Sequence, residues 1–182
     1  VFDDSYYGFT IHEIREMQVM NMGNYAHGNQ PIQHGIYLYG YSGQPWKSQY
    51  WVRQVMDRLY TPTPDGYCGD EDNGQTSAWY VFSAMGFYPV CPGTGQYVLG
   101  TPYFQKMKLH LENGKQINIL ADGNGCYVDE MQLNGQMYER NYLDMKVLKQ
   151  GANISFRLSE KPNMLRGTTE ADAPYSFSNF SK

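Results

Sequence analysis

The sequence carries little charge and no basic stretch. Charged residues make up 18% of its 182 residues, and 18 acidic against 14 basic side chains give a net charge of −4. Proteins that bind nucleic acid gather lysine and arginine on one face, so we expect no nucleic-acid partner. Long apolar runs are missing as well. None approaches the roughly 20 residues that span a bilayer, so we expect no membrane span.

Cysteine is equally scarce. Cys68, Cys91 and Cys126 show neither a CxxC pair nor the Cys and His spacing of a zinc site. They exclude a full disulfide framework, whereas one disulfide bond and three buried free thiols both agree with the sequence. An initiator Met and a signal peptide are also missing at Val1. The first residues are typical of the interior of a longer protein, so the missing signal indicates no compartment.

Aromatic residues, by contrast, are abundant. They make up 15% of the chain, with 17 tyrosines, and hydrophobic residues reach 41%. This composition predicts a packed core and argues against disorder. Aromatic rings stack on the apolar faces of sugars, but they equally fill the interfaces between helices. The aromatic content alone therefore does not separate a sugar-binding surface from a core.

The hydrophobic pattern changes its period near Pro89 to Pro92, from helical spacing to the alternation of strands. The expected fold class is therefore α+β. It has helices in residues 1–92, a small antiparallel β unit in 93–165 and a loose tail in 166–182. Helices are expected at 10–23, 31–43, 44–60 and 75–87, and strands in hairpins at 106–120 (around Asn113-Gly114) and 128–138 (around Asn134-Gly135) and at 152–158.

An acidic loop precedes the last expected helix. In "CGDEDNGQTSAW" (68–79) three carboxylates, Asp70, Glu71 and Asp72, lie side by side between two glycines. A calcium-binding EF-hand is excluded, because its sixth and twelfth positions would not be Gly and Glu. Two interpretations stay open. Crowding can raise the pKa of one carboxyl and make it a general base, or Asp72 or Asn73 can cap the helix.

Two further segments combine chemically useful side chains. "IHEIREM" (11–17) resembles the zinc motif HExxH but ends in Glu16 instead of His. His12 and Glu13 point about 100° apart on a helix, so they suit one extended ligand better than one metal ion. "YAHGNQPIQH" (25–34) offers the side-chain oxygens of Asn29 and Gln30, which suit a sugar hydroxyl or a hard cation. An exposed helical turn and an ordinary loop are the alternatives.

These segments together resemble the C-terminal part of family 92 glycoside hydrolases, which are calcium-dependent, inverting exo-α-mannosidases. The likeness runs from Phe2 to Asn163 and is most specific in "GDEDNGQTSAWYVFSAMGFYPVCPG". It implies that residues 1–92 are the last helices of an (α/α)6-barrel-like catalytic domain. It also implies Ca²⁺ as cofactor, a mannose-containing glycan as substrate, and a secreted or periplasmic bacterial enzyme.

The resemblance also implies roles for individual residues. Asp70 and Asp72 match the region of the catalytic base. His12 and Glu13 match the pair that holds the leaving mannose in α-1,2-specific members. His27, Asn29 and Gln30 match a loop that binds sugar near the calcium ion, with Asn29 and Asp72 as metal ligands. Many members have Glu at the position of Gln30, which lowers the charge here.

One part of the family pattern is missing. Neither Glu13 nor Glu71 matches the motif of the family's general acid, which lies further upstream, and the N-terminal β-sandwich is absent as well. The chain is therefore expected to be about a quarter of the enzyme, with the missing N-terminal part as its partner. Alone, it is expected to be inactive. The alternative is a non-catalytic carbohydrate-binding or structural module.

Overall fold

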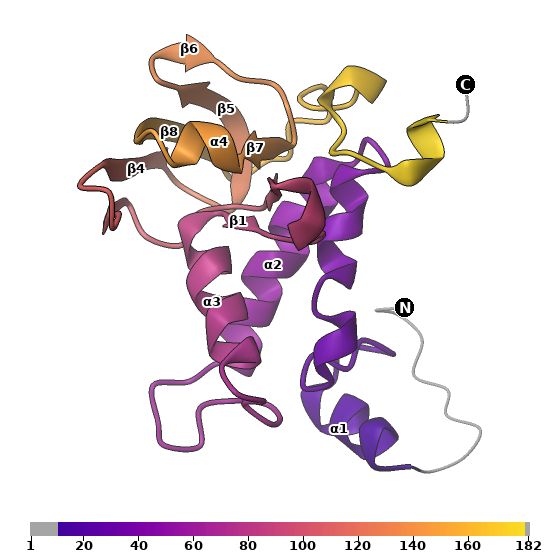
Figure 1. The fold of residues 1–182 in the computed structure, drawn as a ribbon. Coiled ribbons are helices and arrows are strands. Elements are labelled where there is room, and N and C mark those ends of the chain that lie inside the picture. Colours follow the sequence, from indigo (N-terminus) through magenta and orange to yellow (C-terminus); the bar gives the residue numbers. More distant parts are fainter. Residues whose placement is uncertain (1–10, 181–182) are drawn as a thin grey trace.

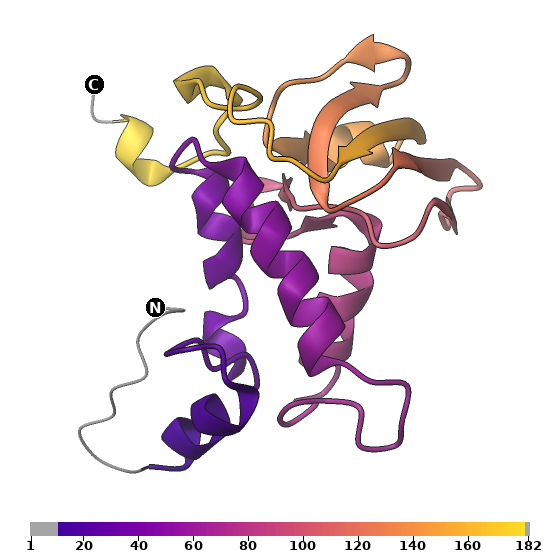
Figure 2. The same cartoon turned by 180° about the vertical axis from the view of Figure 1, so that it is seen from behind.

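The computed structural model describes residues 11–180. The long helices and the strands occupy different parts of the molecule (Figure 1). Two helices, α2 (Pro45–Leu59) and α3 (Gln75–Met85), run below the sheets. The shorter α1 (His12–Met20) lies at the end of the molecule away from the sheets. Figure 2 shows from behind that the long loop between α2 and α3 lies at this same end. The expected combination of helices followed by strands is therefore present.

The helices begin and end where the local signals place them, with one exception. α2 has Pro45 in its first turn, and α3 lies between Gly74 (φ 98°) and Gly86 (φ 92°), both in the left-handed conformation that favours glycine. α1 is shorter than expected, because Asn21 adopts a left-handed conformation (φ 49°) and ends it there. α3 is not buried on all sides, since Val81 is 56% exposed.

The expected helix at 31–43 is wrong. This stretch forms two short 3₁₀ helices, η1 (Gln30–Ile32) and η2 (Gly35–Gly40), instead of one α-helix. Gly35 interrupts the run, and glycine is unfavourable inside an α-helix by about 1 kcal/mol relative to alanine. At Gly40 a Cβ atom would lie 3.3 Å from Val98 Cγ1, so a larger residue there would require Val98 to shift slightly.

The helical half has its own core around the α3 residue Trp79. Its indole is fully buried, and Nε1 donates a hydrogen bond to the backbone oxygen of Gln33 at 3.0 Å. Buried side chains from α1, η2 and α2 surround it, among them Met20, Ile36, Tyr37, Val52 and Val55. This packing fixes the start of α3 against the segment 25–40.

The strands form two sheets. A three-stranded sheet has the order β1 (Phe87–Tyr88), β2 (Gln96–Leu99), β7 (Tyr142–Asp144). A five-stranded sheet has the order β3 (Lys106–His110), β4 (Gln116–Gly123), β8 (Ala152–Ser159), β5 (Tyr127–Leu133), β6 (Gln136–Met137). The short helices η3 (Pro92–Thr94) and α4 (Met145–Leu148) connect strands. A second core of apolar side chains fills the space between these sheets and the end of α3.

Both expected hairpins are present. β3 pairs with β4 across the turn that contains Gly114 (φ 77°), and β5 pairs with β6 across Asn134 (φ 53°) and Gly135 (φ 80°). The purely antiparallel arrangement is wrong for one pair, because β4 and β8 run parallel. No hairpin joins these two strands. The chain returns to β4 through β5, β6, β7 and α4, so β8 enters from the same direction as β4.

The expected loose tail is also wrong at its start. Arg166 is 4% exposed, and its guanidinium donates to the backbone oxygens of Tyr138 (2.8 Å) and Arg140 (3.4 Å). The side chain of Asn141 donates to the backbone oxygen of Gly167 at 2.6 Å. Two 3₁₀ helices follow, η4 (Glu170–Asp172) and η5 (Phe177–Phe180). The sequence has no periodicity here, because side-chain contacts and not a regular element hold the segment.

The three cysteines are free thiols, with Cys91 exposed and the other two half-buried. The open choice between one disulfide bond and none is thereby settled. Within residues 11–180, no helix has the length and apolar character that crossing a bilayer requires.

Candidate active site

The acidic loop and the segment 25–34 meet at two glycines. A Cβ atom on Gly69 would lie 2.6 Å from Gly28 Cα, and one on Gly28 would lie 3.0 Å from the backbone oxygen of Cys68. Only glycine permits such a close approach of two backbones. Two segments that are distant in the sequence therefore form one surface at the start of α3.

Hydrogen bonds hold the two loops together. Gln30 Nε2 donates to the backbone oxygen of Asp70 at 2.8 Å, and Thr76 Oγ1 donates to the same oxygen at 2.9 Å. Behind them, the buried Gln33 donates through Nε2 to Thr76 Oγ1 (3.3 Å) and to the backbone oxygen of His27 (3.2 Å). The structure thus brings Gln30 and the acidic loop together through a side-chain contact to the backbone.

Glu71 is the acid that caps α3. Its carboxylate accepts the backbone N–H groups of Gly74 and of Ser77, the latter at 2.8 Å. Hydrogen bonds from the side chain and the backbone of Ser77 and from the backbone of Gly74 hold the pKa of Glu71 below its ordinary value. The expectation that Asp72 or Asn73 caps the helix is wrong, because α3 has no side-chain cap at Gly74 and Glu71 reaches these donors instead.

The carboxylates of Asp70 and Asp72 differ from that of Glu71 in having no partner among the described residues. Both are exposed, and within residues 11–180 neither carboxylate has a hydrogen bond or an ion pair. Asp72 and Asn73 have left-handed backbones (φ 49° and 56°), followed by Gly74 at 98°. Asp and Asn tolerate this conformation better than other side chains, although it costs of order 1 kcal/mol per residue. The backbone turns sharply here and leaves the Asp72 carboxylate outside the helix cap.

His27 lies inside the core. Its ring is fully buried, with Nδ1 2.8 Å from Tyr25 Oη and Nε2 2.7 Å from Tyr60 Oη. It packs edge-on against Trp79 with ring centroids 4.3 Å apart. Burial lowers the pKa of His27 to about 3, so the imidazole is neutral. This geometry does not support the expected contact of His27 with a sugar, because both ring nitrogens already have partners.

Asn29 lies next to the contact of the two loops and is exposed. Amide and carboxylate oxygens are the ligands that Ca²⁺ prefers, and the pair Asn29 and Asp72 provides both kinds on two loops in contact. No group of three His, Cys, Asp or Glu side chains suitable for a metal ion gathers in residues 11–180. The donor chemistry fits Ca²⁺, but a full set of six to eight oxygens needs further ligands such as backbone carbonyls and water.

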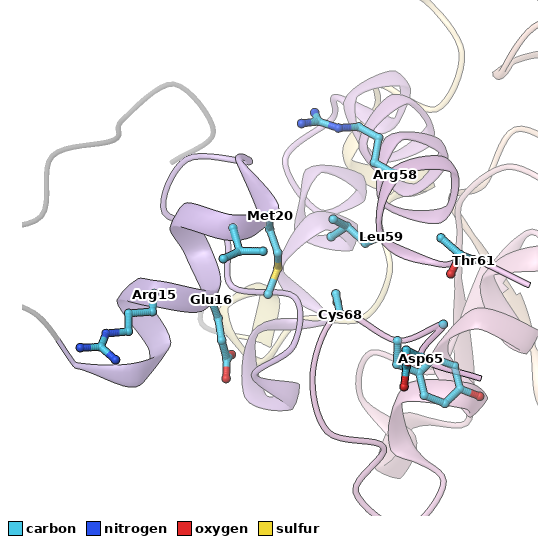
Figure 3. Close-up of a pocket in the computed structure, with 11 residues that line it drawn as sticks. Arg15, Glu16, Met20, Arg58, Leu59, Thr61, Asp65 and Cys68 are labelled. Atoms are coloured by element: carbon cyan, nitrogen blue, oxygen red, sulfur yellow. The ribbon is translucent and has the colours of Figure 1, made fainter. Parts of the chain in front are cut away.

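A pocket of about 440 Å³ lies between α1 and the segment that ends at Cys68, where the acidic loop begins (Figure 3). Asp70 and Asp72 are not among the residues that line it. Arg15, Glu16 and Met20 of α1 line one wall, and Leu59 and the segment up to Cys68 line the other. α1 also carries His12 and Glu13, whose side chains lie outside the described part of the structure. The pocket shows that the helix with this pair and the segment leading into the acidic loop share one cavity.

Unpaired carboxylates and exposed amide oxygens on two loops in contact are groups that a hydrolase acting on a polar substrate can use. The comparisons with known proteins narrow this class. Residues 2–160 match the family model described as "Glycosyl hydrolase family 92 catalytic domain". The chain belongs to glycosyl hydrolase family 92.

Solved structures show the same relationship. The chain is 59% identical to an inverting mannosidase of family 92 from Bacteroides thetaiotaomicron, with a TM-score of 0.82, and the match covers 94% of this chain and 24% of that one. Another family 92 α-mannosidase from the same organism is 40% identical, with a TM-score of 0.84 and coverage of 86% and 22%. These homologues indicate a glycoside hydrolase.

A curated relative is more distant. It is described as an uncharacterized secreted glycosidase from Arthroderma benhamiae, and it is 27% identical over 155 residues, which are 82% of this chain and 20% of that protein. The chain spans about a fifth to a quarter of the length of these relatives.

The sequence did not single out two features of the site. One is the hydrogen-bonded pair Gln33 and Thr76, and the other is the pair of tyrosines around His27. A polar residue one position into an apolar helix, as Thr76 is, was the available signal, because a buried hydroxyl needs a partner. The two partners of Thr76, Gln33 and Gln30, lie 43 and 46 positions away from it along the chain.

Proposed function

We propose that this chain is part of an inverting exo-acting α-mannosidase that removes terminal α-linked mannose, α-1,2-linked in particular, from glycans. One observation carries the proposal: of three neighbouring acids, Glu71 caps the helix while Asp70 and Asp72 remain exposed and unpaired. The similar family 92 mannosidases support the substrate class. A structure of one of them contains mannoimidazole, a mannose-like ligand.

Asp70 or Asp72 acts as the general base in this proposal. The carboxylate takes a proton from a water molecule, and the oxygen of that water bonds to the anomeric carbon of the mannose. The glycosidic bond breaks on the opposite face, and its oxygen takes a proton from a general acid that no residue of this chain matches. Attack from the opposite face inverts the anomeric configuration.

The specificity for α-1,2 linkages is assigned to His12 and Glu13. Both belong to α1, whose next turn lines the pocket between α1 and the segment that ends at Cys68. We propose that they hydrogen-bond the sugar that leaves. A site built to bond sugar hydroxyls rejects an analogue that lacks them, because its polar groups then stay unpaired.

Asn29 and Asp72 are the proposed ligands for Ca²⁺ from this chain. When bound, the ion would hold hydroxyl groups of the terminal mannose and stabilise its distorted ring. The exposed carboxylate and amide oxygens of the two contacting loops suit a hard cation. The name of the fungal relative, a secreted glycosidase, supports a location outside the cytoplasm, in a secreted or periplasmic enzyme.

Hydrolysis of an α-1,2-mannobiose by the complete protein tests this function. Replacing a general base costs about 10²- to 10⁴-fold in rate, so we expect a loss of this size for Asp70→Asn, Asp72→Asn or both. Asp122→Asn, an exposed aspartate of the five-stranded sheet, is the matched control and should keep full activity. Mannose binding without any hydrolysis by the unmodified protein would favour the carbohydrate-binding module instead.

A further inference from the structure

The backbone oxygen of Asp70 receives two side-chain hydrogen bonds from different parts of the chain. Gln30 Nε2 donates to it at 2.8 Å across 40 positions, and Thr76 Oγ1 donates at 2.9 Å from the first turn of α3. A carbonyl oxygen only accepts hydrogen bonds, so each partner must present a donor. The peptide group at the start of the acidic triplet is thereby held from two sides.

The contact with Asp70 uses the amide nitrogen of Gln30. Its Nε2 also lies 3.5 Å from Thr76 Oγ1, so the amide nitrogen faces the loop and α3. A carboxylate of the same shape would place an oxygen against the Asp70 oxygen and repel it. The amide at this position therefore gives this chain a donor to the Asp70 oxygen that the members with Glu there lack.

The Thr76 hydroxyl is oriented by amide side chains that run from the buried Gln33 to the exposed Gln75. Gln33 and Thr76 are fully buried, and Gln33 Nε2 donates to Thr76 Oγ1 at 3.3 Å. Gln75 Nε2 in turn lies 3.4 Å from Gln33 Oε1 and 3.0 Å from Tyr88 Oη. Since the hydroxyl oxygen accepts from Gln33, its hydrogen is free to point at Asp70. Buried networks of this kind are rigid when every member has a partner.

We infer that Gln30 and Thr76 are positioning residues of the acidic loop, which hold the Asp70 peptide so that the carboxylates of Asp70 and Asp72 keep their place. This inference rests on the proposed function for its effect on hydrolysis. It gives Gln30 a different role from the sugar contact that the sequence suggested. Small displacements of a reacting group lower the rate of the chemical step more than they weaken binding.

Three substitutions test the inference in the complete protein. Gln30→Glu and Thr76→Val keep the shape of the side chain but remove its donor, and we expect each to lower kcat about 10-fold with KM changed less than about 2-fold. Thr76→Ser restores the hydroxyl and should recover most of the rate. The double variant should lose less than the product of the two single losses, because both donors act on one oxygen. Gln136→Glu, on the exposed strand β6, is the matched control.

A second measurement does not depend on hydrolysis. Amide hydrogen exchange of residues 70–76 in the 182-residue chain should become at least about 10-fold faster in Gln30→Glu and Thr76→Val, while the amides of β8 stay protected and show an intact fold. Unchanged exchange in both variants overturns the inference. So does a Gln30→Glu protein with raised KM and unchanged kcat, which identifies a sugar contact. An unmodified protein without hydrolysis refutes the proposed function alone, and the exchange rates then decide the positioning role.

Discussion

At the scale of single residues, three adjacent acids have three different surroundings. The Glu71 charge is compensated by backbone N–H groups at the start of α3, where the helix dipole also favours a negative charge. Asp70 is held through its backbone oxygen and Asp72 through its left-handed backbone, so both carboxylates face outwards. The crowding of charge is therefore tolerated because one acid stabilises the loop that presents the other two.

His27 gives a prediction about pH. Burial lowers its pKa to about 3, whereas an unfolded chain has the ordinary value near 6.5, so the unfolded state binds more protons below that value. The contribution of His27 to stability is complete above about pH 6.5 and is lost as the pH falls towards 3. Between pH 6 and 4, we expect the free energy of unfolding to fall by about 1 kcal/mol per pH unit more steeply than in His27→Gln.

Denaturant unfolding of the chain at several pH values measures this difference. His110→Gln, at an exposed histidine of β3, is the matched control. Equal slopes in His27→Gln and the unmodified chain would show that His27 is accessible to protons in the folded state.

At the scale of elements, the contact of two loops through Gly28 and Gly69 decides whether a site exists. Nothing within one loop requires this contact, which depends on α3 packing its Trp79 against the segment 25–40. The turn at Asp72 and Asn73 then aims the acids away from the helix axis. The candidate site therefore depends on the contact of the two loops, on the packing of α3 and on the turn before α3.

Gly69→Ala tests this contact. The added methyl group would lie 2.6 Å from Gly28 Cα and 2.9 Å from its backbone oxygen, so the loops must separate. We expect a loss of about 1–3 kcal/mol in stability, the usual cost of overpacking, together with reduced hydrolysis by the complete protein. Gly93→Ala is the matched control, since nothing lies within 4 Å of its added methyl group. Thermal unfolding of both variants that gives equal midpoints would contradict the close approach.

The same elements show which parts of the fold the sequence determines locally. α2, α3 and the two hairpins follow from proline, glycine and Asn-Gly signals within each segment. The 3₁₀ helices of residues 30–40 and the parallel pair β4 and β8 could not be predicted, because they depend on packing between distant segments. Likewise, the acidic loop stands out in the sequence. That Glu71 and not its neighbours caps α3 depends on which carboxylate the folded loop places next to the N–H groups of Gly74 and Ser77.

At the scale of the whole molecule, the candidate site and the sheets occupy opposite ends of the helices (Figure 1). The two hydrophobic cores meet where α3 ends and β1 begins, so the β unit supports the helices without approaching the acidic loop. The chain also covers only 22–24% of similar solved mannosidases. We propose that the rest of a complete site, including a general acid, comes from residues outside this chain.

The chain by itself is therefore expected to show negligible hydrolysis. An aryl α-mannoside incubated with the 182-residue chain should release no product above the level of an Asp72→Asn chain. Turnover by the unmodified chain that disappears in Asp72→Asn would show that the residues of this chain suffice, and that no further acid is required.

In the proposed mechanism, an aspartate of the acidic loop removes a proton from the attacking water. Azide tests it most directly, because this anion attacks the anomeric carbon without losing a proton. In the complete protein, azide should restore turnover to whichever of Asp70→Asn and Asp72→Asn has lost it, with β-mannosyl azide as product. Full hydrolysis of α-mannosides by both variants without azide, or an inactive variant that azide does not restore, would show that neither aspartate is the general base.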